Sequence, residues 1–289
     1  MDGVPTGLPN MGNTCFLNSA VQVFRRMLFS SSHTSDRNDA QAWYRWWCER
    51  NQNEALHHPN QTYTPGMQED SQRALAAMLD DADEGKLGEG LSSVSEHSRV
   101  DIERWSTCRC SPADIQSVAK QKEHFLFLSL PSDHGVATPS SQQPVSLHSL
   151  VERWVSECNE TVEVGSLKCR HCGRQGLTSS LHLTRAPSRH WLIHLQRYSY
   201  SPSAQGAVKR NDPVTWPSTW TDAGVPFRLH AAIVHQGSMN GGHYVAIVRA
   251  SEGIWYYCSD SHVEAIKEEQ AFQQMQSAYV VMYTLENTS

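Results

Sequence analysis

The spacing of apolar residues divides this chain into a helical first part and a strand-rich second part. One face of residues 16–29 is apolar at helical spacing and is formed by Leu17, Val21, Phe24 and Leu28. A second helix is predicted at 41–50. A third is predicted to start at Thr64 and Pro65, a capping residue followed by proline, and to run to Asp81. The chain before residue 83 is therefore predicted to be mostly helical.

The second part carries short runs rich in β-branched and aromatic residues, which predict strands. These runs are 124–130, 191–200, 227–235, 243–249, 253–258 and 278–285. Polar, turn-rich stretches separate them at 84–99, 131–144 and 201–213, and a short helix is predicted at 264–276. Helices followed by an antiparallel sheet indicate an α+β fold with two lobes, and a cleft between lobes is a natural place for a site.

Charge and cysteine content exclude several classes of protein. A formal net charge of −6 argues against nucleic-acid binding, which normally needs a basic surplus. The apolar runs are too short to span a membrane, and the first residues do not resemble a secretory leader. We therefore expect an intracellular protein, cytoplasmic or nuclear, whose 8 cysteines are reduced thiols and not disulfides.

Residues 7–19, GLPNMGNTCFLNS, form the most informative segment. A glycine-containing turn leads directly into the first predicted helix, which places Cys15 at the helix N-terminus. Free N–H groups and the helix dipole there are expected to lower the thiol pKa and to bind an oxyanion. Asn10 could supply a further amide donor. A lone cysteine here would be interpreted as an ordinary buried residue, but its neighbours favour a nucleophile.

His243 is the expected base. It follows two glycines and starts a predicted strand, an arrangement that holds the ring firmly and leaves room for a substrate backbone. The long separation from Cys15 fits a pair in which each lobe supplies one partner. The alternative is that His243 is simply one of 15 histidines at a strand start.

Four blocks of the chain resemble, in order, the conserved boxes of the ubiquitin-specific proteases. They are residues 7–19, 68–75 (QEDSQRAL), 192–198 (LIHLQRY) and 235–245 (HQGSMNGGHYV). The resemblance implies a papain-like cysteine protease of thumb–palm–fingers architecture, with one catalytic domain over 1–289. In that architecture 1–100 would form a mostly helical thumb, 101–185 the fingers and part of the palm, and 186–289 the palm.

The third member of the catalytic triad departs from the family pattern. Without a gap, residues 255–263 place Ser259 where the family has Asp or Asn, and Asp260 follows it. A serine hydroxyl can accept the Nδ1–H of the histidine, but it cannot stabilise an imidazolium by charge. Our hypothesis is that Ser259 is the direct partner and that Asp260 supplies nearby charge or reaches the ring through a hydrogen bond.

The resemblance also implies contacts to the substrate. Gln68, Asp70 and the residue at position 73 are expected to face the tail of ubiquitin, where an acid would pair with arginines. Position 73 is Arg73 instead of the usual glutamate, so that contact is lost or the modifier preference differs. Tyr198, His235 and Tyr244 either line the channel for a Gly-Gly tail or belong to the core.

Cysteine pairs suggest a structural zinc site, because four thiolates around zinc form a common tetrahedral arrangement. The pairs are Cys108 with Cys110 and Cys169 with Cys172, and in the family such pairs link the tips of the fingers. The first pair has one intervening residue where the family usually has two. Cys158 or His171 could therefore replace a ligand, or the cysteines could be free thiols.

Taken together, the sequence predicts a thiol protease that cleaves after the C-terminal Gly-Gly of ubiquitin through a thioester and needs no cofactor for catalysis. The alternatives are a protease for a ubiquitin-like modifier, a catalytically impaired ubiquitin-binding module and, more distantly, a plain papain-like peptidase. The expected partners are ubiquitin or a ubiquitin-like protein and its conjugates, with no nucleic acid and no membrane. The chain is expected to be a monomer.

Overall fold

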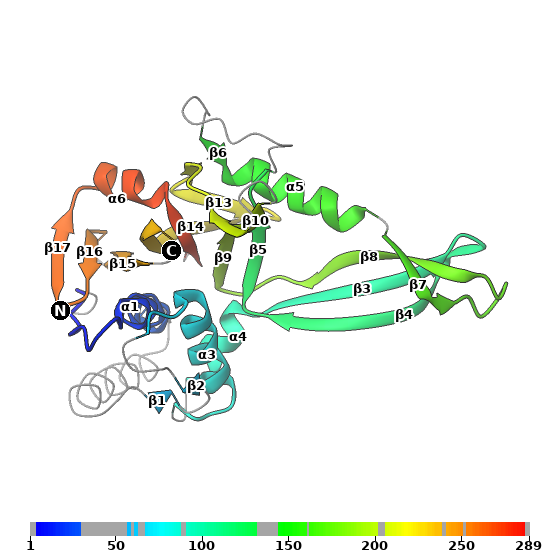
Figure 1. Ribbon diagram of the computed structural model, residues 1–289, viewed down its shortest axis with the longest axis horizontal. Coiled ribbons are helices and arrows are strands. Elements are labelled where there is room, and N and C mark those ends of the chain that lie inside the picture. Colours follow the sequence, from blue (N-terminus) through cyan, green and yellow to red (C-terminus); the bar gives the residue numbers. More distant parts are fainter. Residues whose placement is uncertain are drawn as a thin grey trace.

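The protein has two parts, a body in which helices cover a large sheet and a long, narrow sheet that extends away from it (Figure 1). The computed structural model describes residues 4–29, 57–58, 61–62, 67–87, 91–131, 144–160, 162–201, 206–238, 241–250 and 253–286. No helix among these residues has the length and apolarity needed to cross a membrane.

The large sheet is eight-stranded, with the order β17-β16-β15-β14-β18-β9-β5 and with β13 paired to β14. Neighbouring strands are antiparallel, except that β5 runs parallel to β9. The strands are β5 (Phe125–Ser129), β9 (His190–Gln196), β13 (Thr219–Asp222), β14 (Val225–Ser238), β15 (Gly241–Arg249), β16 (Trp255–Ser259), β17 (His262–Ile266) and β18 (Ala278–Leu285).

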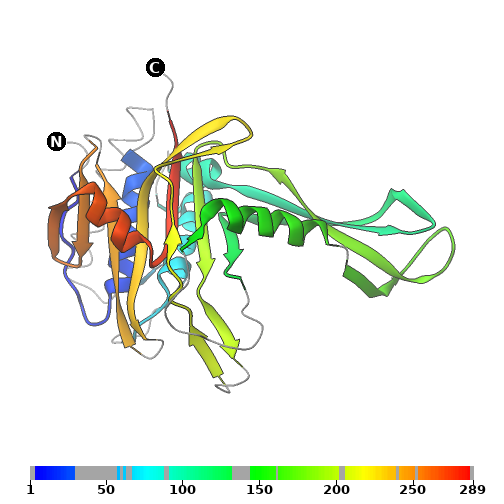
Figure 2. The same ribbon diagram turned by 90° about the horizontal axis from the view of Figure 1, so that it is seen from above.

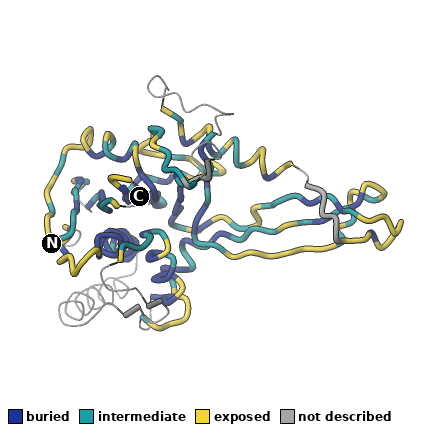
Figure 3. Tube along the Cα trace, in the orientation of Figure 1, coloured by how far each residue is buried: buried dark blue, intermediate teal, exposed yellow. Residues whose placement is uncertain are grey.

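Both faces of this sheet are covered, so apolar residues on the two sides of its central strands are buried. Alternate residues of β15 point to opposite faces, as the pleat requires. Tyr244, Ala246 and Val248 join the core on the side of the first helices, and Val245 and Ile247 join the core on the other side. The burial trace in Figure 3 shows the same concentration of buried residues in the body.

Three helices, α1 (Cys15–Phe29), α3 (Ser71–Asp83) and α4 (Ser92–Ser98), contribute to the first core. Every residue of α1 except Arg25 is buried, because the helix lies between the sheet and α3. α6 (Glu268–Met275) contributes to the core on the opposite face. The start of α1 is therefore held against β15 from one side and against the helical lobe from the other.

The extended sheet has four antiparallel strands in the order β4-β3-β8-β7. They are β3 (Val100–Cys108), β4 (Ser111–Glu123), β7 (Val162–Lys168) and β8 (Gln175–Arg185). α5 (Leu147–Asn159) lies along the base of this sheet and packs on β8 and β5 (Figure 2). The turns at the far end carry the four cysteines of the expected zinc site.

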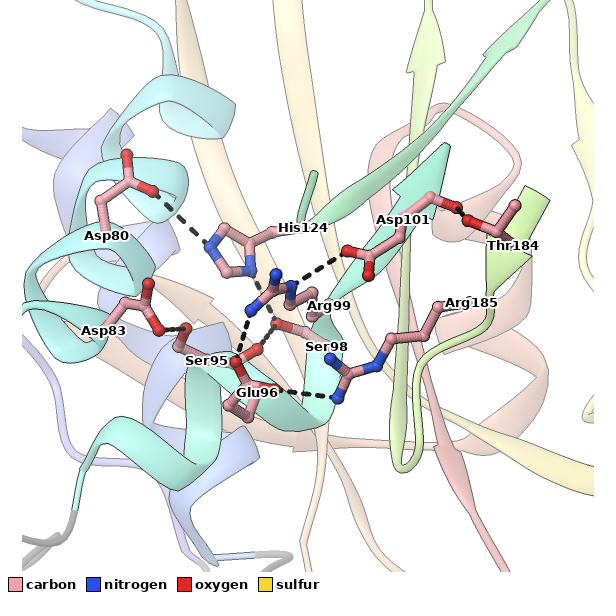
Figure 4. Close-up of polar contacts among 10 residues, drawn as sticks. All are labelled: Asp80, Asp83, Ser95, Glu96, Ser98, Arg99, Asp101, His124, Thr184 and Arg185. Atoms are coloured by element: carbon pink, nitrogen blue, oxygen red, sulfur yellow. Dashed lines mark hydrogen bonds and ion pairs between the residues drawn. The ribbon is translucent and has the colours of Figure 1, made fainter. Parts of the chain in front are cut away.

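A polar cluster joins the base of the extended sheet to the helical lobe (Figure 4). The guanidinium of Arg99 donates to Glu96 at 2.7 Å, and Arg185 of β8 donates to the same carboxylate at 2.8 Å. Ser98, at the end of α4, contacts the ring of His124 at 3.2 Å, just before β5 begins. Helical lobe, extended sheet and large sheet therefore meet at one set of hydrogen bonds.

Short strand pairs complete the fold. β1 (His57–His58) pairs with β2 (Gln61–Thr62), β6 (Val145–Ser146) pairs in parallel with β12 (Val214–Thr215), and β10 (Tyr198–Ser201) forms a hairpin with β11 (Gly206–Lys209).

The predicted α+β class is confirmed, and three predicted boundaries are wrong. The third helix does not start at Thr64 and Pro65. Those two residues lie outside the described ones, but 67–70 are not helical and Asp70 caps α3, accepting from the N–H groups of Gln72 and Arg73 at 2.8 and 3.0 Å. An aspartate that caps the backbone fixes the start more strongly than proline spacing does.

The other two corrections concern stretches with little apolar pattern. Residues 84–99 contain α4 instead of only turns, and the helix predicted at 264–276 starts later because 262–266 form β17. α5 was not predicted. The helix predicted at 41–50 and most of the turn-rich stretch 131–144 lie outside the described residues.

Candidate active site

The turn before α1 is built around the side chain of Asn10. Its carbonyl oxygen accepts from the N–H groups of Gly12 at 3.0 Å and Thr14 at 3.2 Å. Gly12 and Asn13 have positive φ angles of 95° and 58°, a conformation that glycine and asparagine tolerate best. The chain then enters the helix at Cys15, which is 3% exposed.

The environment of Cys15 raises its thiol pKa, chiefly because the sulfur is buried. The N–H of Tyr244 donates to the sulfur and lowers the pKa, whereas the charge of Asp260 raises it. The prediction that the helix N-terminus holds this thiol ionised is therefore wrong for the substrate-free protein. At neutral pH the thiol is protonated and needs a base.

His243 lies one residue before Tyr244 on β15, so it is adjacent in the chain to the residue that contacts the thiol. Its Nε2 lies 2.8 Å from the hydroxyl oxygen of Ser259, the last residue of β16. The expected partner residue is present, but the nitrogen is Nε2 and not Nδ1. Among the described residues, no hydrogen bond joins the Cys15 thiol to this ring. Catalytic hydrogen bonds often form only when substrate is bound.

Asp260 does not contact the ring by a hydrogen bond but binds two amides. It follows β16 with a φ of 52°, so the chain turns there and its side chain leaves the direction of the strand. One carboxylate oxygen accepts from Asn18 at 2.7 Å and the other from Asn10 at 2.8 Å. One N–H of the Asn10 amide is thereby used, and in the described part of the chain the other has no partner.

Cysteine, histidine and serine thus come together from α1, β15 and β16, with an amide-bound carboxylate beside them. A family model described as ubiquitin carboxyl-terminal hydrolase matches residues 6–283 of the chain. The chain belongs to the ubiquitin carboxyl-terminal hydrolase family. The family predicted from the four sequence blocks is therefore confirmed.

Two curated relatives show how the chain compares with full-length members. It is 31% identical over 170 residues to ubiquitin carboxyl-terminal hydrolase 8 of Arabidopsis thaliana, covering 55% of this chain and 19% of that protein. It is 26% identical over 314 aligned positions to the human ubiquitin carboxyl-terminal hydrolase 17-like protein 17, covering 97% of this chain and 56% of that protein. The matched part of the chain therefore corresponds to less than a fifth of the length of the first relative and to a little more than half of the length of the second.

Solved structures confirm the architecture of the hydrolase domain. The SAGA DUB module of Ubp8, Sgf11, Sus1 and Sgf73 bound to ubiquitin aldehyde matches with a TM-score of 0.67 at 16% identity, covering 99% of this chain and 70% of that one. A yeast SAGA DUB module with an Sgf73 mutation matches with a TM-score of 0.69 at 17% identity, covering 99% and 69%. The thumb–palm–fingers fold is thus shown, and the extended sheet is called the fingers below.

The residues expected to face the tail of ubiquitin divide into two half-buried supports and one exposed side chain. Gln68 pairs its side-chain amide with the backbone of Gly242, donating at 3.1 Å and accepting at 3.3 Å. Asp70 is occupied by the cap of α3 and by the hydroxyl of Tyr279 at 2.6 Å. Arg73 is exposed on the first turn of α3. Asp70 therefore acts first as a structural group.

Aromatic residues expected to line the channel form a packed cluster. Tyr244 and His235 are buried with ring centroids 4.5 Å apart, and the hydroxyl of half-buried Tyr198 lies 2.9 Å from Nδ1 of His235. Burial lowers the pKa of His235 to about 4, so this ring is neutral at physiological pH. Of the two expected positions, channel lining or core, Tyr244 and His235 occupy the core, whereas Tyr198 is partly accessible.

The four cysteines at the tips of the fingers converge, and their ligand atoms all lie within 4.8 Å of one another. Sulfur pairs are separated by 3.8 Å for Cys108 and Cys172 and by 3.5 Å for Cys110 and Cys169. Sulfurs bound to tetrahedral zinc at about 2.3 Å lie a little under 4 Å apart. The one-residue spacing of the first pair therefore does not prevent convergence.

The alternative zinc ligands are excluded by position. Cys158 lies near the end of α5, and the ring of His171 contacts Asp114 at 2.6 Å instead of the sulfurs. The N–H of His171 donates to the sulfur of Cys169 at 3.4 Å, as in a metal-binding knuckle, and neighbouring N–H groups lower the pKa of Cys169 to about 6. All seven described cysteines are free.

Two residues of the site were missed by sequence reasoning. Asn18 binds Asp260, and Tyr279 binds Asp70. Asn18 had a detectable signal, because it is a polar residue one turn after Cys15 on a helix that is buried almost all round. Tyr279 had none, since an aromatic residue at the start of a buried strand is ordinary core.

Proposed function

We propose that the chain is a deubiquitinating thiol protease that hydrolyses the peptide or isopeptide bond after the C-terminal Gly-Gly of ubiquitin. The observation that carries the proposal is the convergence of Cys15, His243 and Ser259 in a domain of this family. A net charge of −6 suits a partner whose binding face is basic.

In this proposal His243 is the general base and then the general acid. The ring nitrogen not bound to Ser259 takes the proton of Cys15, and the sulfur attacks the carbonyl carbon of the terminal glycine. The resulting oxyanion accepts from N–H groups at the start of α1 and from the free N–H of Asn10. The imidazolium returns its proton to the leaving amine, and water then hydrolyses the thioester.

The activity is tested with ubiquitin that carries a fluorescent amide on its C-terminal glycine, alongside ubiquitin-like modifiers labelled in the same way. We expect the ubiquitin substrate to be cleaved fastest. Faster cleavage of a ubiquitin-like modifier would favour the alternative that exposed Arg73 already suggests, because a cation repels an arginine-bearing tail. Binding of ubiquitin without cleavage of any substrate would show an impaired binding module.

Ser259 is expected to contribute to the reaction through its hydrogen bond to the ring of His243. Removing the hydroxyl in Ser259→Ala frees the ring of His243 and should lower kcat/KM roughly tenfold, the value of one hydrogen bond in the transition state. Ser259→Asp should restore or exceed the wild-type rate, because a carboxylate stabilises the imidazolium. Steady-state kinetics decide the point, and an unaltered rate in Ser259→Ala would exclude Ser259 as the partner.

The four-cysteine cluster is proposed to hold structural zinc. The residues fit the metal, and the attack by a thiol does not require one. Cys169→Ser should lower zinc content from one ion per chain and lower the melting temperature, because a structural ion stabilises the folded fingers. Cys158→Ser is the matched control. Zinc measured by atomic absorption at the wild-type level in Cys169→Ser would contradict the site.

We further propose that the chain acts on ubiquitin conjugates as a monomer in the cytoplasm or nucleus. Support for the class of substrate comes from the family to which the chain belongs.

A further inference from the structure

We propose that Asn18 is a positioning residue for this reaction, which acts by fixing the Asp260 carboxylate and thereby the turn that carries Ser259. The inference rests on the proposed function. It concerns a side chain that contacts neither the thiol nor the imidazole and whose effect would pass through its neighbours.

Asn18 ties together three segments that are distant in the sequence. Its amide nitrogen lies 2.7 Å from Asp260, in the turn after β16, and 3.2 Å from the carbonyl oxygen of Pro9, in the segment before the nucleophile. The side chain itself belongs to α1, one turn after Cys15. One buried amide therefore connects the helix of the nucleophile, the turn after Ser259 and the segment that leads to α1.

The hydrogen bonds around Asn18 form a closed network between the segment before α1 and the turn after β16. The N–H of Leu8 donates to the carbonyl oxygen of Asp260 at 2.8 Å, so the same two segments are also joined through their backbones. The two segments also pack closely, because a Cβ on Gly7 would lie 2.2 Å from the carbonyl oxygen of Ser261. The turn that follows Ser259 is therefore held from both sides and has little freedom to move relative to α1.

The negative charge of Asp260 makes this hydrogen-bond network relevant to the reaction. Within the described residues no Lys or Arg side chain forms an ion pair with Asp260, so its carboxylate is stabilised by the amides of Asn18 and Asn10 alone. A carboxylate deprived of one donor would be drawn toward other donors nearby, including the helix start at Cys15. Loss of Asn18 should therefore displace Ser259 and disturb the electrostatics at the thiol.

Gln22 provides a matched control on the same helix. It lies one turn further along α1, is buried, and donates to the carbonyl oxygen of Thr6 at 2.7 Å. Gln22→Ala thus removes a comparable amide contact to the same N-terminal segment without touching Asp260. A merely structural role for Asn18 would make the two alanine variants behave alike.

The first experiment compares kcat and KM of Asn18→Ala, Gln22→Ala, Asp260→Asn and the double variant Asn18→Ala/Asp260→Asn with labelled ubiquitin. Asparagine is chosen at position 260 because it tolerates the positive φ. We expect Asn18→Ala to lower kcat roughly tenfold at constant KM, as for the loss of a hydrogen bond to a charged group. In the Asp260→Asn background the same change should cost less than about twofold, because the two residues act as one unit.

A second measurement does not depend on ubiquitin. The pH midpoint of Cys15 alkylation by iodoacetamide, followed by peptide mapping, should rise in Asn18→Ala and fall in Asp260→Asn. Gln22→Ala should leave it unchanged. Equal effects of Asn18→Ala and Gln22→Ala on both readouts, or full additivity with Asp260→Asn, would overturn the inference. If the wild-type protein cleaves no modifier, the proposed function fails and the alkylation midpoints alone decide the role of Asn18.

Discussion

Replacing Cys15 by alanine is expected to abolish hydrolysis while leaving ubiquitin binding intact. Cys15 supplies the only sulfur that the proposed mechanism uses, and without it no thioester can form. His243→Ala should lower kcat/KM by about 10²–10⁴-fold, the usual contribution of a general acid–base residue. The loss is expected to be near the upper end, because burial keeps the thiol protonated and the sulfur depends on the base.

Hydrolysis rates and ubiquitin dissociation constants of the two variants are measured together. Cys158→Ala serves as the control, since Cys158 is also a buried free cysteine but lies on α5, away from the site. It should retain wild-type kcat. A Cys15→Ala variant that still cleaves ubiquitin substrates would show that another group is the nucleophile.

Replacing Arg197 by methionine is expected to destabilise the protein severely. Arg197 is 2% exposed, and its guanidinium donates to the carbonyl oxygens of Ala278, Arg210, Asp212 and Gln276 at 2.8 to 3.2 Å. Methionine fills a similar volume but removes all the hydrogen bonds that the guanidinium donates to these carbonyls. The expected loss is about 3–5 kcal/mol of unfolding free energy, as for breaking a buried polar network.

Thermal and denaturant unfolding measure this loss, which should lower the melting temperature by roughly 10 °C in a domain of this size. Arg228→Met is the control, because Arg228 forms a partly exposed ion pair with Glu286, and such pairs contribute about 1 kcal/mol or less. Similar stability losses in the two variants would contradict the assignment of Arg197 as the structural centre of the β9–β10 junction.

Local patterns predicted the nucleophile helix and the central strands. Apolar spacing placed a helix at 16–29, within one residue of α1, and the run 278–285 coincides with β18. These elements were predictable because each is buried on the face or faces that its spacing indicates. The strand β4 has little apolar alternation and many exposed residues, so its existence depends on pairing with β3 and not on a local signal.

The electrostatics of the site could not be predicted from the sequence. A helix N-terminus lowers a thiol pKa, but how deeply Cys15 is buried and how close Asp260 lies depend on packing between residues far apart in the chain. The same holds for Asp70, whose expected tail contact competes with a cap and with Tyr279. The role of a residue could be predicted where its chemical type determines it. Where the role depends on which neighbouring groups already bind its polar atoms, the structure was required.

Covalent trapping tests the central claim most directly. Ubiquitin with an electrophile in place of its C-terminal glycine carboxylate is incubated with the wild-type protein and with His243→Ala, and the adduct is located by peptide mapping. The account predicts one adduct, on the peptide that contains Cys15, formed at least tenfold more slowly in His243→Ala. An adduct on a different cysteine, or equal rates in the two proteins, would contradict it.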